Sequence, residues 1–108
     1  MTIDIHEKAT IIKDFDSNLD ALLVKLINVN LENQNVILDI SLYKAIKIKD
    51  LNIFFPFAKN IKKNNQSFVI VILDFDFNKA SEKINIVRTI QEAFDLIEME
   101  DIERDLGF

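Results

Sequence analysis

Apolar and polar residues alternate at the start of the chain. The alternation predicts a strand over residues 2–7, and a second short strand follows over 10–15. The tight connection near Glu7 and Lys8 predicts that these two strands form a hairpin.

Two later runs of the sequence are almost continuously apolar. Residues 36–40 and 68–73 contain few polar side chains, as expected of parallel strands that are buried on both faces. A third short strand is predicted over 84–87.

Apolar residues at intervals of three and four predict three helices between and after these strands. The first follows Ser17, which can cap it together with Asp20. The second covers about 49–63. The third begins at a capping box formed by Thr89 and Glu92. Strands that alternate with helices predict an α/β domain with a mixed sheet.

The second predicted helix contains Pro56 among three phenylalanines. A proline inside a helix removes a hydrogen bond and kinks the helix, unless it lies in the first turn. Phe54 and Phe55 fit the stripe that faces the core, whereas Phe57 is expected to point elsewhere. An exposed Phe57 would anchor a partner or a second copy of the chain. Packing against a neighbouring helix is the alternative.

Composition excludes several classes of protein. A chain of 108 residues fits one domain with a modest core. It has no cysteine, which excludes disulfides, cysteine-ligated zinc, iron–sulfur clusters and thiol catalysis. We see no signal peptide, and no apolar run approaches the roughly 20 residues that cross a bilayer. We therefore expect a cytoplasmic protein without a membrane segment.

The charge is concentrated at the C-terminus. The net charge of −5 argues against binding nucleic acid through its phosphates. Residues 89–108 contain seven acidic side chains and one arginine, a net charge of −6. A charged helix end followed by Leu106, Gly107 and Phe108 is typical of a short recognition element. A docked helix and an extended acidic tail over 99–108 are the alternatives.

The order of hairpin, helix, strand, helix, strand, short strand and helix resembles the STAS domain, the fold of bacterial anti-sigma-factor antagonists. The resemblance is strongest over residues 35–73, whose spacing needs no insertion. It implies one STAS-like α/β domain over 1–108, with an N-terminal hairpin and a mixed sheet of about four strands. Its helices would pack mainly on one face. The resemblance also implies a non-catalytic regulatory module that binds another protein.

The segment from Arg88 to Phe108 is similar to the ending of a group of short bacterial STAS-like proteins. Members of that group often carry a ribonuclease Z name, by association with a neighbouring nuclease. That nuclease family needs a cluster of histidines that bind metal, and His6 is the only histidine here. Nuclease activity is therefore not expected. An accessory role in RNA metabolism stays open as an alternative.

The phosphorylated serine of STAS antagonists lies in an Asp-Ser-Ser-Gly-like turn at the start of the second helix. There, backbone amides and the helix dipole can meet a phosphate. The matching stretch here is Lys47-Ile48-Lys49-Asp50, which has neither a hydroxyl group nor a glycine. The resemblance thus implies the fold and the binding of partners, without the phosphorylation switch.

No catalytic group stands out. His6 lies alone on the polar side of a predicted edge strand, and the only glycine, Gly107, cannot form a phosphate-binding loop. Asp39, Asp74 and Asp76 lie near the carboxyl ends of predicted strands, where open α/β sheets bind ligands. We favour loop capping for them over a receiver-like Mg²⁺ or phosphoryl-transfer site, because we find no acidic pair after the first strand and no lysine after the last. We expect no enzyme activity, cofactor or metal.

Lysines gather around the second predicted helix, and we favour a solvated face over an RNA-binding one. They are Lys44, Lys47, Lys49, Lys59, Lys62 and Lys63. The predicted partner-binding surface joins the start of that helix to its phenylalanine and to the C-terminal segment. It consists of Lys47, Lys49, Asp50, Asn52, Phe57, Arg104, Leu106 and Phe108. A homodimer stays open.

Overall fold

The computed structural model describes residues 1–31, 33–44, 46–73 and 84–107. Along the chain it contains strands β1 Thr2–Ile5 and β2 Thr10–Lys13, helix α1 Leu19–Ile27, strand β3 Val36–Asp39, the 3₁₀ helix η1 Ile48–Phe54, helix α2 Phe55–Lys63, strands β4 Phe68–Val71 and β5 Asn85–Val87, and helix α3 Ile90–Asp105. This is the predicted order of elements. Asp74, Asp76 and Phe108 lie outside the described residues.

The strands form one mixed sheet in the order β1-β2-β3-β4-β5. The predicted hairpin is confirmed, because β1 pairs antiparallel with β2, and the remaining pairs are parallel. The sheet has five strands rather than about four. Lys13, Asp39 and Val71 are aligned in register, so β2, β3 and β4 end together. We call this end of the sheet the carboxyl edge and the opposite end the amino edge.

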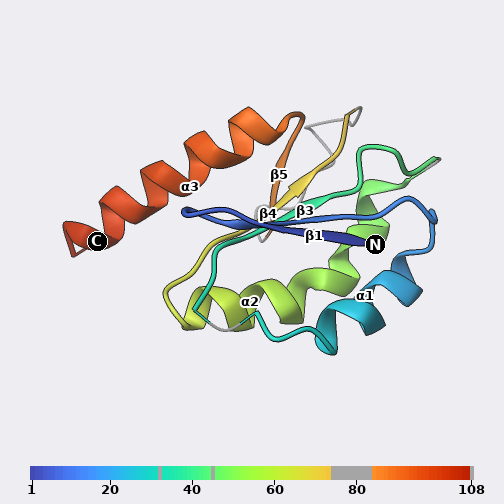
Figure 1. Ribbon diagram of the computed structural model, residues 1–108, viewed down its shortest axis with the longest axis horizontal. Coiled ribbons are helices and arrows are strands. Elements are labelled where there is room, and N and C mark those ends of the chain that lie inside the picture. Colours follow the sequence, from blue (N-terminus) through green and yellow to red (C-terminus); the bar gives the residue numbers. More distant parts are fainter. Residues whose placement is uncertain (32, 45, 74–83, 108) are drawn as a thin grey trace.

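Helices cover both faces of the sheet. Figure 1 shows α1 and α2 on one side and α3 on the other. The prediction of helices mainly on one face therefore holds for α1, η1 and α2 but not for α3. Successive crossovers of one hand that move in one direction across a sheet place their helices on the same face. Helix α3 follows the last strand and is free of this constraint. No helix in the described part of the chain is long and apolar enough to cross a membrane.

Pro56 does not kink a helix, because the predicted second helix is two helices. The 3₁₀ helix η1 ends at Phe54, and Pro56 lies in the first turn of α2, where its missing N–H is harmless. The 3₁₀ helix has about three residues per turn, which shifts the phase of the apolar stripe. The predicted orientation of Phe57 away from the core is therefore wrong. Its ring packs edge-on against Phe68, with 5.2 Å between centroids.

Short polar side chains begin two of the helices. Asn18, rather than the predicted Ser17, caps α1, and its side-chain oxygen accepts a hydrogen bond from the backbone N–H of Ala21 at 3.1 Å. The cap of α3 is as predicted, because Thr89 accepts from the backbone N–H of Glu92 at 3.1 Å. Each cap satisfies a backbone N–H that has no partner within its helix.

Asparagines also make the turns of a chain with a single glycine. Asn33 and Asn65 adopt positive φ angles of 61° and 62° at the amino edge, which asparagine tolerates better than most residues. Asn35 is buried at the same edge. Its side chain accepts from the backbone N–H of Ser67 at 2.8 Å and donates to the carbonyl oxygen of Lys8 at 2.9 Å. Asn35 thereby ties the hairpin to the turn before β4.

Candidate functional site

Three large apolar side chains are exposed along the carboxyl edge. Phe15, Leu42 and Leu73 are 47%, 55% and 66% exposed. Each lies two or three residues beyond the end of β2, β3 or β4. Neighbouring strands are only about 5 Å apart, so the three residues belong to adjacent loops. We call them the edge patch. The register of the strands places all three at one edge of the sheet, and exposed apolar side chains that form a patch mark contact surfaces.

Lysine side chains lie beside the edge patch or follow it along the chain. The ammonium group of Lys13 lies 5.7 Å from the centroid of the Phe15 ring, within the range of a cation–π contact. Lys44, Lys47 and Lys49 are exposed in the loop and helix that follow Leu42. A polar rim around apolar residues is the usual anatomy of a protein interface.

A buried polar pair lies beneath this surface. Asp14 is 1% exposed and accepts a hydrogen bond from the hydroxyl group of Tyr43. Burial raises the pKa of Asp14, but the hydrogen bond from Tyr43 and the charge of Lys25 outweigh it, so its pKa lies below the usual 3.8. Burial raises the pKa of Tyr43, and its hydrogen bond to Asp14 raises it further. At neutral pH the pair is a carboxylate and a phenol, which fix the loop after β3 against β2.

The expectation that no acidic pair follows the first strand needs correction. Asp14 and Asp16 directly follow β2, the first of the parallel strands. The predicted strand over 10–15 includes Asp14, whereas β2 ends at Lys13 and leaves both aspartates beyond it. Asp16 lies 3.2 Å from the ammonium group of Lys25. Asp39 caps its loop by accepting from the backbone N–H of Ser41 at 3.0 Å, the role favoured from sequence.

The described residues contain no group of three acidic, histidine or cysteine side chains placed to hold a metal ion. A shallow hollow of about 490 Å³ lies between the start of α1 and η1. Its lining includes Asp16, Tyr43, Lys44 and Asp50. Among the described residues of the predicted partner-binding surface, Asp50 borders this hollow.

The residues of the predicted partner-binding surface do not form one surface. Lys47, Lys49, Asp50 and Asn52 are exposed at the start of η1. Helix η1 packs against α1, and Figure 1 shows α1 and the C-terminus at opposite ends of the long axis. The direction of α3 explains the separation, because it starts after β5 at the carboxyl edge and ends beside Ser67 at the amino edge. Phe57 is half-buried on α2, and Phe108 lies outside the described residues.

The last turns of α3 are tied to the sheet through polar side chains. The guanidinium group of Arg104 donates to the hydroxyl oxygen of Ser67 at 3.2 Å and to Asp101. Glu100 accepts from the hydroxyl group of Ser67 and from the amide of Asn85. Residues 99–105 therefore continue α3 and are held at the amino edge.

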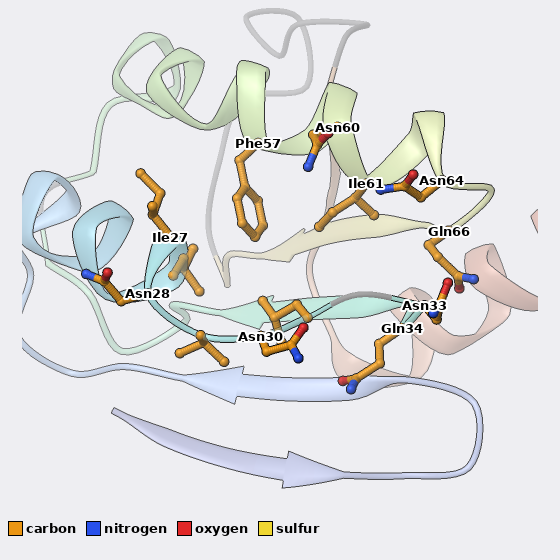
Figure 2. A pocket seen from close by; sticks show the side chains of 13 residues that line it. Ile27, Asn28, Asn30, Asn33, Gln34, Phe57, Asn60, Ile61, Asn64 and Gln66 are labelled. Carbon is orange, nitrogen blue, oxygen red and sulfur yellow. The ribbon is translucent and has the colours of Figure 1, made fainter.

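A second hollow, which the sequence did not reveal, opens between the end of α1 and α2 (Figure 2). Its volume is about 470 Å³, and Phe57 and Ile61 point into it from α2. Its polar lining consists of carboxamides from Asn28, Asn30, Asn33, Gln34, Asn60, Asn64 and Gln66. Carboxamides donate and accept hydrogen bonds but transfer no protons, so these residues can bind a molecule without reacting with it. The only signal in the sequence is the run of asparagines after both helices.

His6 lies at the turn of the hairpin and packs edge-on against Phe94 of α3, with 5.9 Å between ring centroids. This contact joins the exposed hairpin to the helix on the same face of the sheet. It accounts for the ring without a catalytic role.

Comparison with known proteins adds nothing to this picture. The chain matches no protein-family model, and no curated protein is similar to it in sequence. Its candidate sites are therefore defined by its own residues alone.

Proposed function

We propose that this chain is a non-catalytic protein-interaction module that contacts its partner through the carboxyl edge. It would act in the cytoplasm as a STAS-like regulatory domain, related in type to anti-sigma-factor antagonists but without their phosphorylated serine. The observation that carries the proposal is the edge patch of Phe15, Leu42 and Leu73. The order of elements along the chain supports the STAS-like assignment.

The edge patch supplies what a binding site needs energetically. Fully burying a large apolar side chain contributes about 1.5–3 kcal/mol. Lys13, Lys44 and Lys47 at its rim would steer an acidic partner, because rim charges act mainly on the rate of association. The hydrogen bond between Tyr43 and Asp14 fixes the loop that carries Leu42, which lowers the entropy lost on binding.

The ionisable groups at the carboxyl edge favour binding over proton transfer. Asp14 is buried in its hydrogen bond with Tyr43. Asp16 is paired with Lys25, and Asp39 caps its own loop. The edge-patch side chains themselves carry no group that could act as an acid, a base or a nucleophile. This distribution of roles supports an interaction surface.

The proposal can be tested by affinity capture from a cytoplasmic extract with the full chain as bait. Phe15→Ser, Leu42→Ser and Leu73→Ser together should abolish capture of the partner. A matched control is Val24→Ser with Ile27→Ser, since these residues of α1 are similarly exposed at 60% and 66%. The control should capture as the parent chain does.

Two outcomes would contradict the proposal. One is capture that survives the triple variant, or that is lost equally in the α1 control. The other is tight binding of Mg²⁺ or a nucleotide by the parent chain in calorimetry, which would indicate a reaction site.

A further inference from the structure

In the C-terminal half of α3, polar side chains face the sheet and apolar side chains are exposed, the reverse of the usual arrangement in a helix that covers a sheet. Glu100 and Arg104 face the sheet and bond to Ser67. Met99, Ile102 and Leu106 are 57%, 54% and 66% exposed. Intervals of three and four residues place these three side chains on one side of a helix. We call them the outer stripe.

In the first half of α3 the arrangement is the usual one. Ala93 and Ile97 are fully buried against Ile37, Val69 and Val71. Apolar side chains thus anchor the first half, and hydrogen bonds to Ser67 and Asn85 anchor the second. The outer stripe contributes nothing to covering the sheet.

Acidic residues border the outer stripe on both sides. If Met99 and Leu106 are assigned to heptad position a and Ile102 to d, then Glu98 and Asp105 fall at g and Glu103 at e. All three acids are exposed, and Glu98 lies 4.0 Å from the ammonium group of Lys8. Residues at e and g determine which helix can pair with a seam, through charges across the interface.

We propose that the outer stripe binds a helix of another protein, with apolar residues at heptad spacing flanked by lysine or arginine. Charge selects this occupant over a second copy of the chain. Two outer stripes facing each other would place acids opposite acids, which destabilises pairing. A basic partner helix would instead form ion pairs with Glu98, Glu103 and Asp105 around the apolar seam. The proposal shares no residue with the edge patch and does not depend on it.

The rest of α3 prepares the outer stripe for this contact. Thr89 caps the start of the helix, and Gly107, at φ 80°, ends it just after Leu106. The helix is already formed and docked, so only the partner must be ordered on binding. The stripe covers about two turns, which limits the affinity to that of a short seam.

The test uses two synthetic peptides of three heptads with leucine at a and d. One peptide has lysine at every e and g position, and the other has glutamate there. Calorimetry with the full chain should show the lysine peptide binding at least about tenfold more tightly. Met99→Gln, Ile102→Gln and Leu106→Gln together should weaken that binding about tenfold or more, while Val24→Gln with Ile27→Gln on α1 should leave it unchanged.

Reversal of charge sharpens the test. Glu98→Lys, Glu103→Lys and Asp105→Lys together should invert the preference, so that the glutamate peptide binds more tightly. The edge-patch serine variant should bind the lysine peptide as the parent chain does, which separates this proposal from the function proposed above. Circular dichroism checks that each variant keeps its helices.

Three results would overturn the proposal. The first is that the parent chain binds the two peptides equally well, or binds neither of them. The second is undiminished binding of the lysine peptide to the glutamine variant, which would reduce the contact to charge alone. The third is self-association of the parent chain in sedimentation that the glutamine variant abolishes, which would make the occupant a second copy.

Discussion

The two faces of the sheet are covered in different ways. On one face, α1, η1 and α2 bury a continuous apolar cluster around Phe54, Leu38 and Ile70. On the other face, the first half of α3 contributes the apolar side chains of the described helices to a smaller cluster that includes Ile37 and Ile97. The second half of α3 is held by Ser67, Glu100 and Arg104.

The comparison distinguishes apolar residues that stabilise the fold from apolar residues that are available to contact another protein. On the face covered by α1, η1 and α2, the apolar side chains that point toward the sheet fill the core, and Val24 and Ile27 of α1 stay exposed on the opposite side of that helix. Where one helix covers a face and is partly anchored by polar side chains, its apolar residues remain free for another protein. Hydrogen bonds at the end of α3 thus release Met99, Ile102 and Leu106 from the core.

The largest expected effect compares matched isoleucines on the two faces. Ile70 and Ile37 lie on adjacent central strands, and both are fully buried. Replacing a buried isoleucine by alanine costs about 2–5 kcal/mol, depending on how far the site can collapse. We expect Ile70→Ala near the upper end, because two helices fix its surroundings. Ile37→Ala should fall near the lower end, because α3 alone can move toward the cavity.

Urea unfolding measures both free energies of unfolding, with unchanged m-values as the control for two-state behaviour. Equal costs, or a larger cost for Ile37→Ala, would show that α3 seals its face as rigidly as α1 and α2 seal theirs.

The second prediction concerns the polar pair beneath α1. Tyr43→Phe removes only the hydroxyl group that bonds to Asp14, and it should cost about 1–3 kcal/mol because the buried carboxylate loses its partner. The folded-state pKa of Asp14 lies below its usual 3.8. Its stabilisation is therefore present above that value and is lost as the pH falls through the folded-state pKa. The gap in stability between the parent chain and Tyr43→Phe should shrink as the solution becomes acidic.

Thermal unfolding from about pH 7 to about pH 3 measures this gap. Asp14→Asn provides the control, because it removes the titrating group, and Tyr43→Phe made in that background should show no gap that depends on pH. A gap that stays constant across the range would mean that Tyr43 does not lower the pKa of Asp14.

Sequence patterns predict β3 and β4 well, because a strand that is buried on both faces has an almost continuously apolar sequence. The cap at Thr89 is equally local. The predicted outward orientation of Phe57 is wrong. The change from 3₁₀ to α geometry near Pro56 alters the number of residues per turn, so the apolar stripe no longer follows one α-helical spacing. Apolar periodicity cannot tell whether Ile102 faces the core or the solvent. It identifies an apolar side of the helix but does not show whether that side packs against the sheet.

The edge patch cannot be predicted from any single segment of the sequence. The register of β2, β3 and β4 is what places Phe15, Leu42 and Leu73 at the same edge of the sheet. Asp14 was hidden for a similar reason, since its partner Tyr43 is 29 residues away along the chain. Local sequence patterns predict single helices and strands, whereas the candidate sites are formed by residues from several of them.

The smallest expected effect tests the polar anchor of α3. Glu100→Ala removes the acceptor for Ser67 and Asn85, and it should cost about 0.5–1.5 kcal/mol, the usual net value of a hydrogen bond. Glu103→Ala, at an exposed position of the same helix, should change stability by less than about 0.5 kcal/mol. Hydrogen exchange should locate the loss of protection from Met99 onward, while the turns around Ala93 stay protected, because apolar packing holds them. If both variants exchanged alike, the polar contacts would not be what holds the end of α3, and the outer stripe would lose its fixed orientation.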